Sequence, residues 1–242
     1  MSYIRSADAA LYYEEYGTGE NLILLPGPFG TIDLEWRRFI PPLAGHFHTI
    51  AVDLRGHGRT NNPSSTLRPE QVLSDLRTFF DTLEISSAYL CANEHVGMFA
   101  LQFALRNPGR ILGLILHSPC SGSRQRPASS YSDEILQRAH AHANGPDGWK
   151  VLLRESPRLF ASAAEPDPAD LSAFRVPVLV AISNHCDADE MAGTEQFARA
   201  FGICAVVRLQ STGRGIGSVN RDELVDAVIG FSSRSGRSGP AT

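Results

Sequence analysis

The sequence has almost no lysine and no long apolar run. Lys150 is the one lysine among 242 residues, and 22 Lys and Arg residues stand against 26 Asp and Glu, for a net charge of −4. This balance gives no sign of a nucleic-acid-binding surface. No apolar run approaches the length of a membrane span. Residues 1–19 carry four charged side chains, so we expect no signal peptide and a cytoplasmic protein.

Cysteine is also scarce, and its spacing matches no disulfide framework. The four cysteines are Cys91, Cys120, Cys186 and Cys204. Reduced thiols in a cytoplasmic protein are the simplest interpretation of this pattern.

The sequence contains no convincing metal or cofactor motif. His140 and His142 are two residues apart on an expected helix and so do not share a face. Asp187 and Asp189 lack a third partner at ligand spacing. The glycine-rich residues 213–217 resemble a dinucleotide fingerprint, but they follow a strand late in the chain with no second βα unit. We therefore expect no metal and no cofactor.

Short apolar runs alternate with amphipathic helical segments along the chain. The runs are typical of strands buried on both faces, and the alternation favours a mostly parallel α/β sheet with helices on both sides. Strands are expected twice within 4–17 and at 21–25, 48–53, 86–90, 111–116, 176–183 and 205–209, and helices at 34–43, 69–83, 97–106 and 222–231.

A long insertion is expected between two of these strands. Residues 119–175 exceed a simple crossover and carry two helical runs, 132–143 and 149–164. We predict a small lid over the carboxyl ends of the strands, where ligands bind in open α/β sheets. The lid belongs to a single domain, residues 1–231. Residues 232–242, rich in Ser, Gly and Arg, are expected to be a disordered tail.

The segment after the strand at 86–90 has the form of a nucleophile elbow without its serine. A strand, a sharp turn and a helix, with small residues around one central side chain, are typical of that device. The usual pattern is G-x-S-x-G, and the chain has Asn93-Glu94-His95-Val96-Gly97. We place His95 at the centre, with Asn93 and Gly97 in the glycine positions, because Asn tolerates a left-handed backbone.

Six motifs in this order resemble the α/β-hydrolase superfamily over about residues 10–231. They are LILLPGPFG, DLRGHGRT, NEHVG, ALRNPGRI, VPVLVAISNHCD and STGRGIGSVNRDEL. The resemblance implies an α/β-hydrolase fold and a site with a nucleophile, a histidine base and an acid. His57 in the second motif is expected to be structural, on burial grounds.

The resemblance also shows a degenerate triad. The nucleophile position carries His95, and the histidine position, next to Gly213, carries Arg214. The acid position falls on Cys186, with Asp187 one residue further on. These departures suggest that hydrolysis has been abandoned.

The oxyanion hole is expected to be incomplete as well. Its first donor in the family is the N–H of the residue after an H-G pair, and here Pro26-Gly27 is followed by Pro28, which has no N–H. Loss of one such donor costs about 3 kcal/mol of transition-state stabilisation. The N–H of Val96 is the remaining candidate.

The polar candidates have both functional and purely structural interpretations. His95 can serve as acid or base near neutral pH. Arg214 either binds a substrate carboxylate, enolate or phenolate through its guanidinium group, or forms a salt bridge with a lid carboxylate. Asp187 orients His95, pairs with Arg214, or is a surface residue. Cys186 is expected to contact the substrate as an inert small side chain more readily than to act as a nucleophile.

Apolar candidates for the pocket wall are Phe29, Trp149 and Phe160, which core packing explains equally well.

The sequence therefore predicts a cofactor-free enzyme acting by proton transfer on a small cyclic or aromatic metabolite. A lyase, isomerase, cyclase or dehydratase step in specialised-metabolite biosynthesis is the leading hypothesis. One alternative is a catalytically dead pseudo-hydrolase that binds a ligand or a partner protein. Another is a hydrolase with recruited residues, such as Cys186 with His185. We expect a small-molecule substrate, no nucleic acid and no membrane, and the choice between monomer and homodimer stays open.

Overall fold

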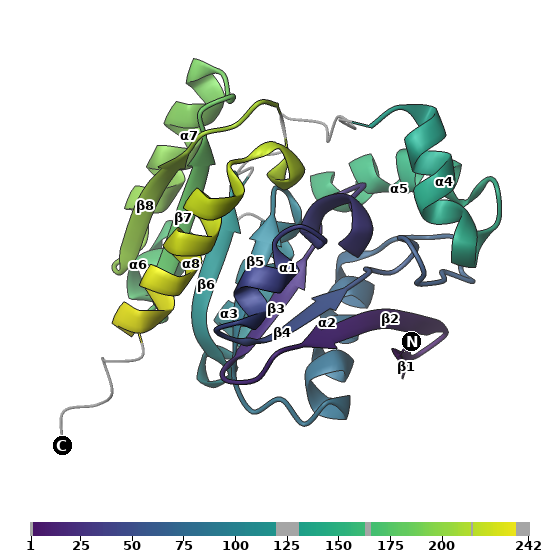
Figure 1. Cartoon of the computed structure of the whole chain (residues 1–242), viewed down its shortest axis with the longest axis horizontal. Coiled ribbons are helices and arrows are strands. Elements are labelled where there is room, and N and C mark those ends of the chain that lie inside the picture. The colour runs from purple at the N-terminus through teal and green to yellow at the C-terminus, as the bar shows by residue number, and fades with distance from the viewer. Residues whose placement is uncertain (1, 120–130, 163–165, 214, 236–242) are drawn as a thin grey trace.

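The computed structural model of the chain describes residues 2–119, 131–162, 166–213 and 215–235. In this part of the chain, eight strands form one sheet in the order β1-β2-β4-β3-β5-β6-β7-β8 (Figure 1). Strand β2 is antiparallel to both its neighbours, and all other pairs are parallel, as the sequence predicts. The strands are β1 (Ser2–Ser6), β2 (Ala9–Tyr16), β3 (Asn21–Leu25), β4 (His48–Val52), β5 (Ala88–Asn93), β6 (Ile111–His117), β7 (Val178–Ser183) and β8 (Cys204–Leu209).

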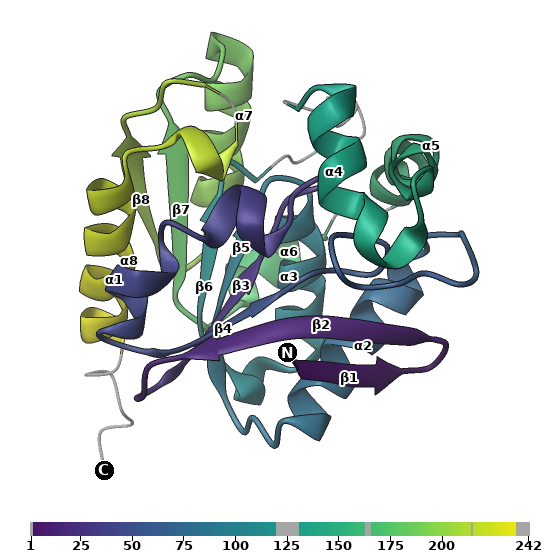
Figure 2. The ribbon, with the colours of Figure 1, turned by 45° about the vertical axis from the view of Figure 1, so that its right-hand side comes forward.

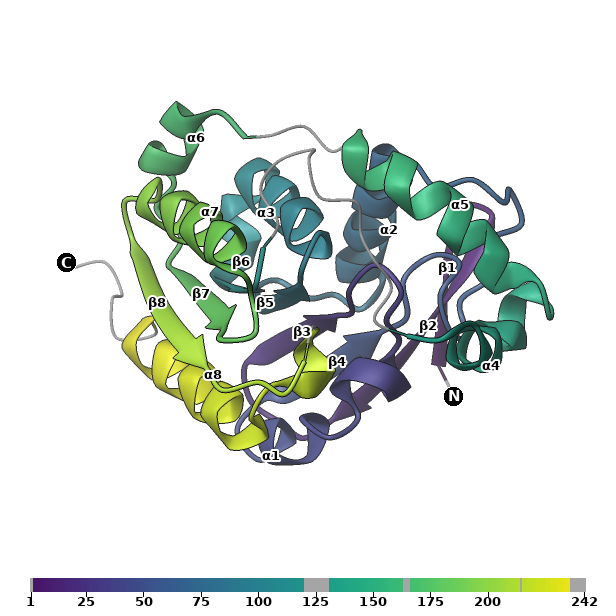
Figure 3. The same cartoon turned by 90° about the horizontal axis from the view of Figure 1, so that it is seen from above.

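Helices connect the strands and cover both faces of the sheet. Seen from above, α1 and α8 lie on one side of the sheet, and α2, α3 and α7 lie on the other (Figure 3). The helices are α1 (Ile40–Ala44), α2 (Pro69–Thr82), α3 (Val96–Arg106), α4 (Asp133–Asn144), α5 (Gly148–Ala161), α6 (Pro168–Ala173), α7 (Ala188–Arg199) and α8 (Arg221–Ser235), with short turns η1 (Ile32–Trp36), η2 (Pro108–Arg110) and η3 (Ile216–Ser218).

The helix expected at 34–43 is two separate pieces, η1 and α1. Pro41 and Pro42 lie in the first turn of α1. Proline has no N–H to continue a helical hydrogen-bond ladder, so the first helical piece ends before these residues and a new helix begins with them.

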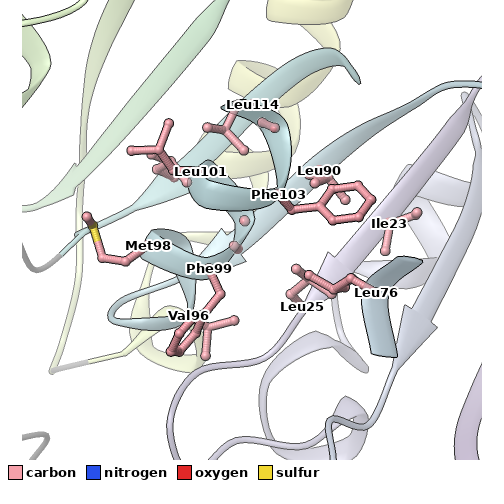
Figure 4. Packing of buried hydrophobic residues seen from close by; sticks show 14 of the residues in the cluster. Ile23, Leu25, Leu76, Leu90, Val96, Met98, Phe99, Leu101, Phe103 and Leu114 are labelled. Carbon is pink, nitrogen blue, oxygen red and sulfur yellow. The ribbon is translucent and has the colours of Figure 1, made fainter. Parts of the chain in front are cut away.

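The strand β5 is buried on both faces and links the two halves of the core. Leu90 belongs to the cluster between the sheet and α2 and α3, whereas Tyr89 and Cys91 belong to the cluster beneath α1 and α8. Figure 4 shows the first cluster, where Phe99 and Phe103 of α3 pack with residues of β3, β5 and α2. This packing fixes the start of α3, and with it the turn between β5 and α3.

The two helical runs predicted for the lid correspond to α4 and α5, which lie together at one end of the molecule (Figure 2). Two side chains one helical turn apart tie α4 to the loop after β4. His140 Nδ1 accepts the Gly58 N–H at 3.0 Å, and Asn144 Nδ2 donates to the Gly56 carbonyl at 3.1 Å. The carboxyl end of the sheet is therefore covered at this point. Residues 120–130 and 163–165 of the expected lid lie outside the described residues.

The C-terminal helix is longer than the sequence predicts. Helix α8 continues to Ser235, so the first four residues of the expected tail, 232–235, are helical, and 236–242 lie outside the described residues. None of the helices in the described ranges is long and apolar enough to cross a bilayer. The cytoplasmic location stays a prediction.

Candidate active site

The turn between β5 and α3 has Glu94 at its apex, not His95. Strand β5 ends at Asn93 and helix α3 begins at Val96. Glu94 has φ +49°, in the left-handed region, whereas His95 has φ −60° and ψ −27°, which are helical values. A strained left-handed residue is what a strand-to-helix elbow requires at its centre. The predicted placement of His95 at the centre is therefore wrong by one residue.

Gly97 explains why His95 was misplaced: this glycine allows close packing of α3 and is not part of the turn. A Cβ on Gly97 would lie 3.2 Å from Leu116 Cδ2, so glycine lets α3 approach β6 closely. The position two residues after the apex is Val96, which is buried. The residue directly after the apex is His95, so the position that the sequence analysis gave to Val96 as oxyanion donor falls on His95.

His95 belongs to an aromatic wall beside the apex. Its side chain is 7% exposed, and its ring centroid lies 5.1 Å from that of Phe160 on the lid helix α5. Phe160 in turn lies 5.7 Å from Phe99 of α3. Phe160 was a predicted wall residue, and the structure joins it to His95.

Glu35 of η1 is a buried carboxyl group that the sequence analysis missed. Its Oε2 accepts hydrogen bonds from the Gly27 N–H at 2.7 Å and from Asn93 Nδ2 at 3.1 Å. Burial raises the pKa of Glu35 to about 7, the Gly27 N–H opposes this, and the negative charge of Glu94 adds to it. Glu35 and Glu94 thus form an interacting carboxyl pair, in which Glu35 takes up a proton near neutral pH.

Tyr131, just before α4, joins this pair from the lid side. Its hydroxyl donates to Glu35 Oε1 at 3.4 Å. Burial and the charges of Glu35 and Glu94 raise the pKa of Tyr131, so the phenol stays protonated. The sequence offered no periodic signal for this residue.

Asn93 connects the carboxyl pair to a buried histidine. Its Nδ2 donates to Glu35, so its Oδ1 accepts from His117 Nδ1, at 2.7 Å. Burial lowers the pKa of His117 to about 4, so this imidazole is neutral. Asn93 is held from both sides and fixes the orientation of Glu35.

The loop that carries the family's histidine position lies against Glu94. A Cβ on Gly215 would be 3.7 Å from Glu94 Oε1. Arg214, predicted to bind substrate, lies outside the described residues.

Asp187, at the predicted acid position, has a local structural role. Its side chain is exposed at the N-terminus of α7, where Oδ1 accepts the Glu190 N–H at 2.8 Å and forms a capping box. Cys186 is half-buried, with Sγ 3.8 Å from Ser118 Oγ, and His185 is exposed. The catalytic role of Asp187 and the substrate-binding role of Cys186 stay predictions.

The loop that follows β3, which carries Phe29, is held by two buried histidines. The Pro28 and Phe29 carbonyls accept from Nε2 of His57 and His140, at 2.8 and 3.2 Å. Phe29 is 4% exposed, and Trp149 is half-buried against the core. His57 is buried with both ring nitrogens on backbone carbonyls, which agrees with a structural role.

Within the described ranges, no group of three His, Cys, Asp or Glu side chains is placed to hold a metal ion.

A family model for the α/β hydrolase fold matches residues 20–159. The chain belongs to the α/β-hydrolase family. It is similar to a haloalkane dehalogenase of Agrobacterium fabrum, 30% identical over 144 residues, which are 60% of this chain and 46% of that protein. It is 32% identical to 2-hydroxy-6-oxo-2,4-heptadienoate hydrolase of Pseudomonas putida over 105 residues, 42% of this chain and 38% of the relative. The chain thus matches less than half the length of these relatives.

Solved structures agree with this membership at the level of the fold. A carboxylesterase of Nitrososphaera gargenis superposes with a TM-score of 0.78 at 16% identity and covers 98% of this chain and 100% of its own. The enol-lactonase of Burkholderia xenovorans LB400 gives a TM-score of 0.76 at 20% identity, covering 96% and 100%. The predicted fold class is confirmed.

Proposed function

We propose that this chain is an enzyme that moves protons on a small organic substrate, with Glu94 as the general base. The observation that carries the proposal is the left-handed backbone of Glu94, φ +49°, at the apex of the elbow. The family presents its reacting side chain at this point. A carboxylate there can take a proton from carbon or oxygen.

Ester hydrolysis through a hydroxyl nucleophile does not fit these residues. The apex carries a carboxylate, and Pro28 has no N–H for the oxyanion. The family's histidine position holds Arg214, so a base for activating water is absent from that position. Proton transfer needs none of these groups.

The aromatic wall supports a flat substrate. The rings of His95, Phe160 and Phe99 follow one another at 5.1 and 5.7 Å beside the apex. Such rings bind cyclic or aromatic molecules by apolar contact and stacking. An elimination, isomerisation, cyclisation or dehydration on such a molecule is the reaction class we assign.

A benzisoxazole ring opening tests the base directly. In nitrobenzisoxazole, a base removes the C–H proton, the N–O bond breaks, and a coloured cyanophenolate forms. We expect saturable turnover that falls by about 10²–10⁴-fold in Glu94→Gln, the usual range for a lost general base. Glu84→Gln is the matched control, because Glu84 also has a positive φ, +52°, but is exposed. Equal turnover in Glu94→Gln and in the unchanged protein would refute the proposal.

A second candidate uses the same carboxylate as a nucleophile. Glu94 occupies the nucleophile position, and carboxylates form covalent ester intermediates in other enzymes. With bromobutane, a Glu94 oxygen would bond to carbon as bromide leaves. Since the histidine position is Arg214, the butyl ester should accumulate, and intact mass spectrometry should detect one butyl group that is absent in Glu94→Gln. Absence of both turnover and adduct would favour the ligand-binding alternative.

A further inference from the structure

Tyr131 bridges the buried and the accessible parts of the site. Glu35 is 4% exposed and cannot itself meet a substrate, whereas Tyr131 is half-buried at the edge of the lid. The Tyr131 hydroxyl contacts Glu35 Oε1 at 3.4 Å. The negative charges of Glu35 and Glu94 both raise the pKa of this phenol, so it interacts with both carboxyl groups.

We propose that Tyr131 donates a proton to the substrate opposite Glu94, and that Glu35 replaces that proton from the interior. This inference rests on the proposed function, because it assigns the acid that complements the base Glu94. It gives the site two catalytic residues, Glu94 and Tyr131, and one proton reservoir, Glu35.

The hydrogen bonds of Glu35 decide which oxygen carries the proton. Oε2 already accepts two N–H groups, from Gly27 and from Asn93. The proton of neutral Glu35 therefore belongs on Oε1, the oxygen that contacts Tyr131. In this neutral form Oε1–H donates to the Tyr131 oxygen, the reverse of the bond that Tyr131 donates to the carboxylate, and the phenol proton is left for the substrate. Burial with the charge of Glu94 raises the pKa of Glu35 to about 7, which keeps a proton available at neutral pH.

The relay conserves the charge of the site. The substrate proton bonds to a Glu94 oxygen, the Tyr131 O–H bond breaks as its proton bonds to the substrate, and the Glu35 proton restores the phenol. One carboxyl group is ionised before the step and one after it, so the step adds no second negative charge to the pair. The new carboxylate of Glu35 is stabilised by the N–H groups of Gly27 and Asn93.

The Tyr131 phenol can also serve as the oxyanion hydrogen-bond donor that the loop after β3 lacks. Pro28 offers no N–H to a developing oxyanion. A neutral O–H donor held in a buried site can stabilise such a charge and then give up its proton. The substrate class that fits is one whose leaving or enolising oxygen becomes negative as Glu94 removes a proton.

The first test uses two benzisoxazoles that differ in the basicity of the departing phenolate. Tyr131→Phe and Glu35→Gln should each lower kcat on unsubstituted benzisoxazole by about 10²-fold, with KM nearly unchanged. The loss should be smaller on nitrobenzisoxazole, because its phenolate needs less protonation. The double variant should resemble either single variant, since both act in one relay. Tyr3→Phe, at an exposed tyrosine, is the matched control.

The two proposals fail in different ways. Loss of turnover in Glu94→Gln with full kcat in Tyr131→Phe and Glu35→Gln would overturn the relay and leave Glu94 as the base. A separate measurement tests the relay even without turnover, by NMR titration of protein labelled with carbon-13 at the Glu carboxyl groups. The signal lost in Glu35→Gln should titrate near pH 7 and move upward in Tyr131→Phe, which removes a hydrogen bond to the carboxylate. A Glu35 signal that stays ionised down to about pH 5 would overturn the relay.

Discussion

Glu94 and His95 are neighbours with opposite backbone conformations, +49° and −60° in φ, so only Glu94 stands at the apex of the turn. His95 directly precedes α3, and its ring packs against that of Phe160 at a tilt. One polar residue is thus presented to the site and the next becomes part of its wall. The strain of a left-handed non-glycine residue, of order 1–3 kcal/mol, is maintained by the packing on both sides of the turn.

This difference predicts the outcome of replacing His95. His95→Phe keeps an aromatic ring against Phe160, so we expect kcat on nitrobenzisoxazole within about threefold of the unchanged protein, far from the 10²–10⁴-fold loss expected at Glu94. Steady-state kinetics of both variants checks this. A loss of about 10²-fold or more in His95→Phe would restore the sequence-based assignment of His95 as acid or base.

The strands and the major helices could be predicted because their signals are local. An apolar run such as β3 or an amphipathic segment such as α2 carries its period in consecutive residues. The apex was misplaced by one residue because Gly97 matched the pattern for a reason that lies in β6, which a local pattern does not contain.

Glu35 and Tyr131 were missed for a related reason. Their contact joins residues 96 positions apart, and neither stands in a motif. A buried carboxyl group is specified by its partners, here Gly27 and Asn93, and those partners come together only in the folded chain. The glycine at position 30 was the available signal, since the Glu35 carboxyl fills the space of its missing side chain.

Ester hydrolysis should be absent and should not return with a serine. We expect p-nitrophenyl acetate to be hydrolysed no faster than by free imidazole at the same concentration. Glu94→Ser should not improve on this, because Pro28 still lacks an N–H and residue 214 is still arginine. Release of nitrophenol, followed by absorbance, measures both proteins. Saturable hydrolysis by the unchanged protein that disappears in Glu94→Ala would show a hydrolase.

Gly30→Ala should displace Glu35. The added Cβ would lie 2.2 Å from Glu35 Oε1, which is closer than any permitted contact, so the carboxyl group must move off Gly27 and Asn93. We expect a loss of about 1–3 kcal/mol in the free energy of unfolding, together with loss of the Glu35 titration near pH 7. Urea unfolding and carboxyl NMR measure the two effects.

Gly193→Ala is the matched control for this substitution. A Cβ at Gly193 meets nothing within 4 Å, and the residue lies inside α7, where alanine is favoured by up to about 1 kcal/mol. Equal stability changes in the two variants would contradict the close packing of Glu35 on Gly30.

His140 should make the lid attachment sensitive to acid. Burial, with a contribution from the neighbouring His57, lowers the pKa of His140 from 6.5 to about 3, and its Nδ1 must stay unprotonated to accept the Gly58 N–H. The unfolded chain therefore binds a proton that the folded chain does not, between about pH 6.5 and pH 3. The stability that neutral His140 provides is present above pH 6.5 and is lost as the pH falls through that window.

His140→Gln isolates this effect. A glutamine amide can accept from Gly58 and donate to the Phe29 carbonyl, as the imidazole does, but it does not titrate. Urea unfolding at pH 7 and pH 5 should show that the unchanged protein loses about 2 kcal/mol more than His140→Gln over this interval. His142→Gln, on the exposed side of the same helix, should follow the unchanged protein. An equal loss in His140→Gln and the unchanged protein would mean that His140 is not held neutral by its contacts with Gly58 and Phe29.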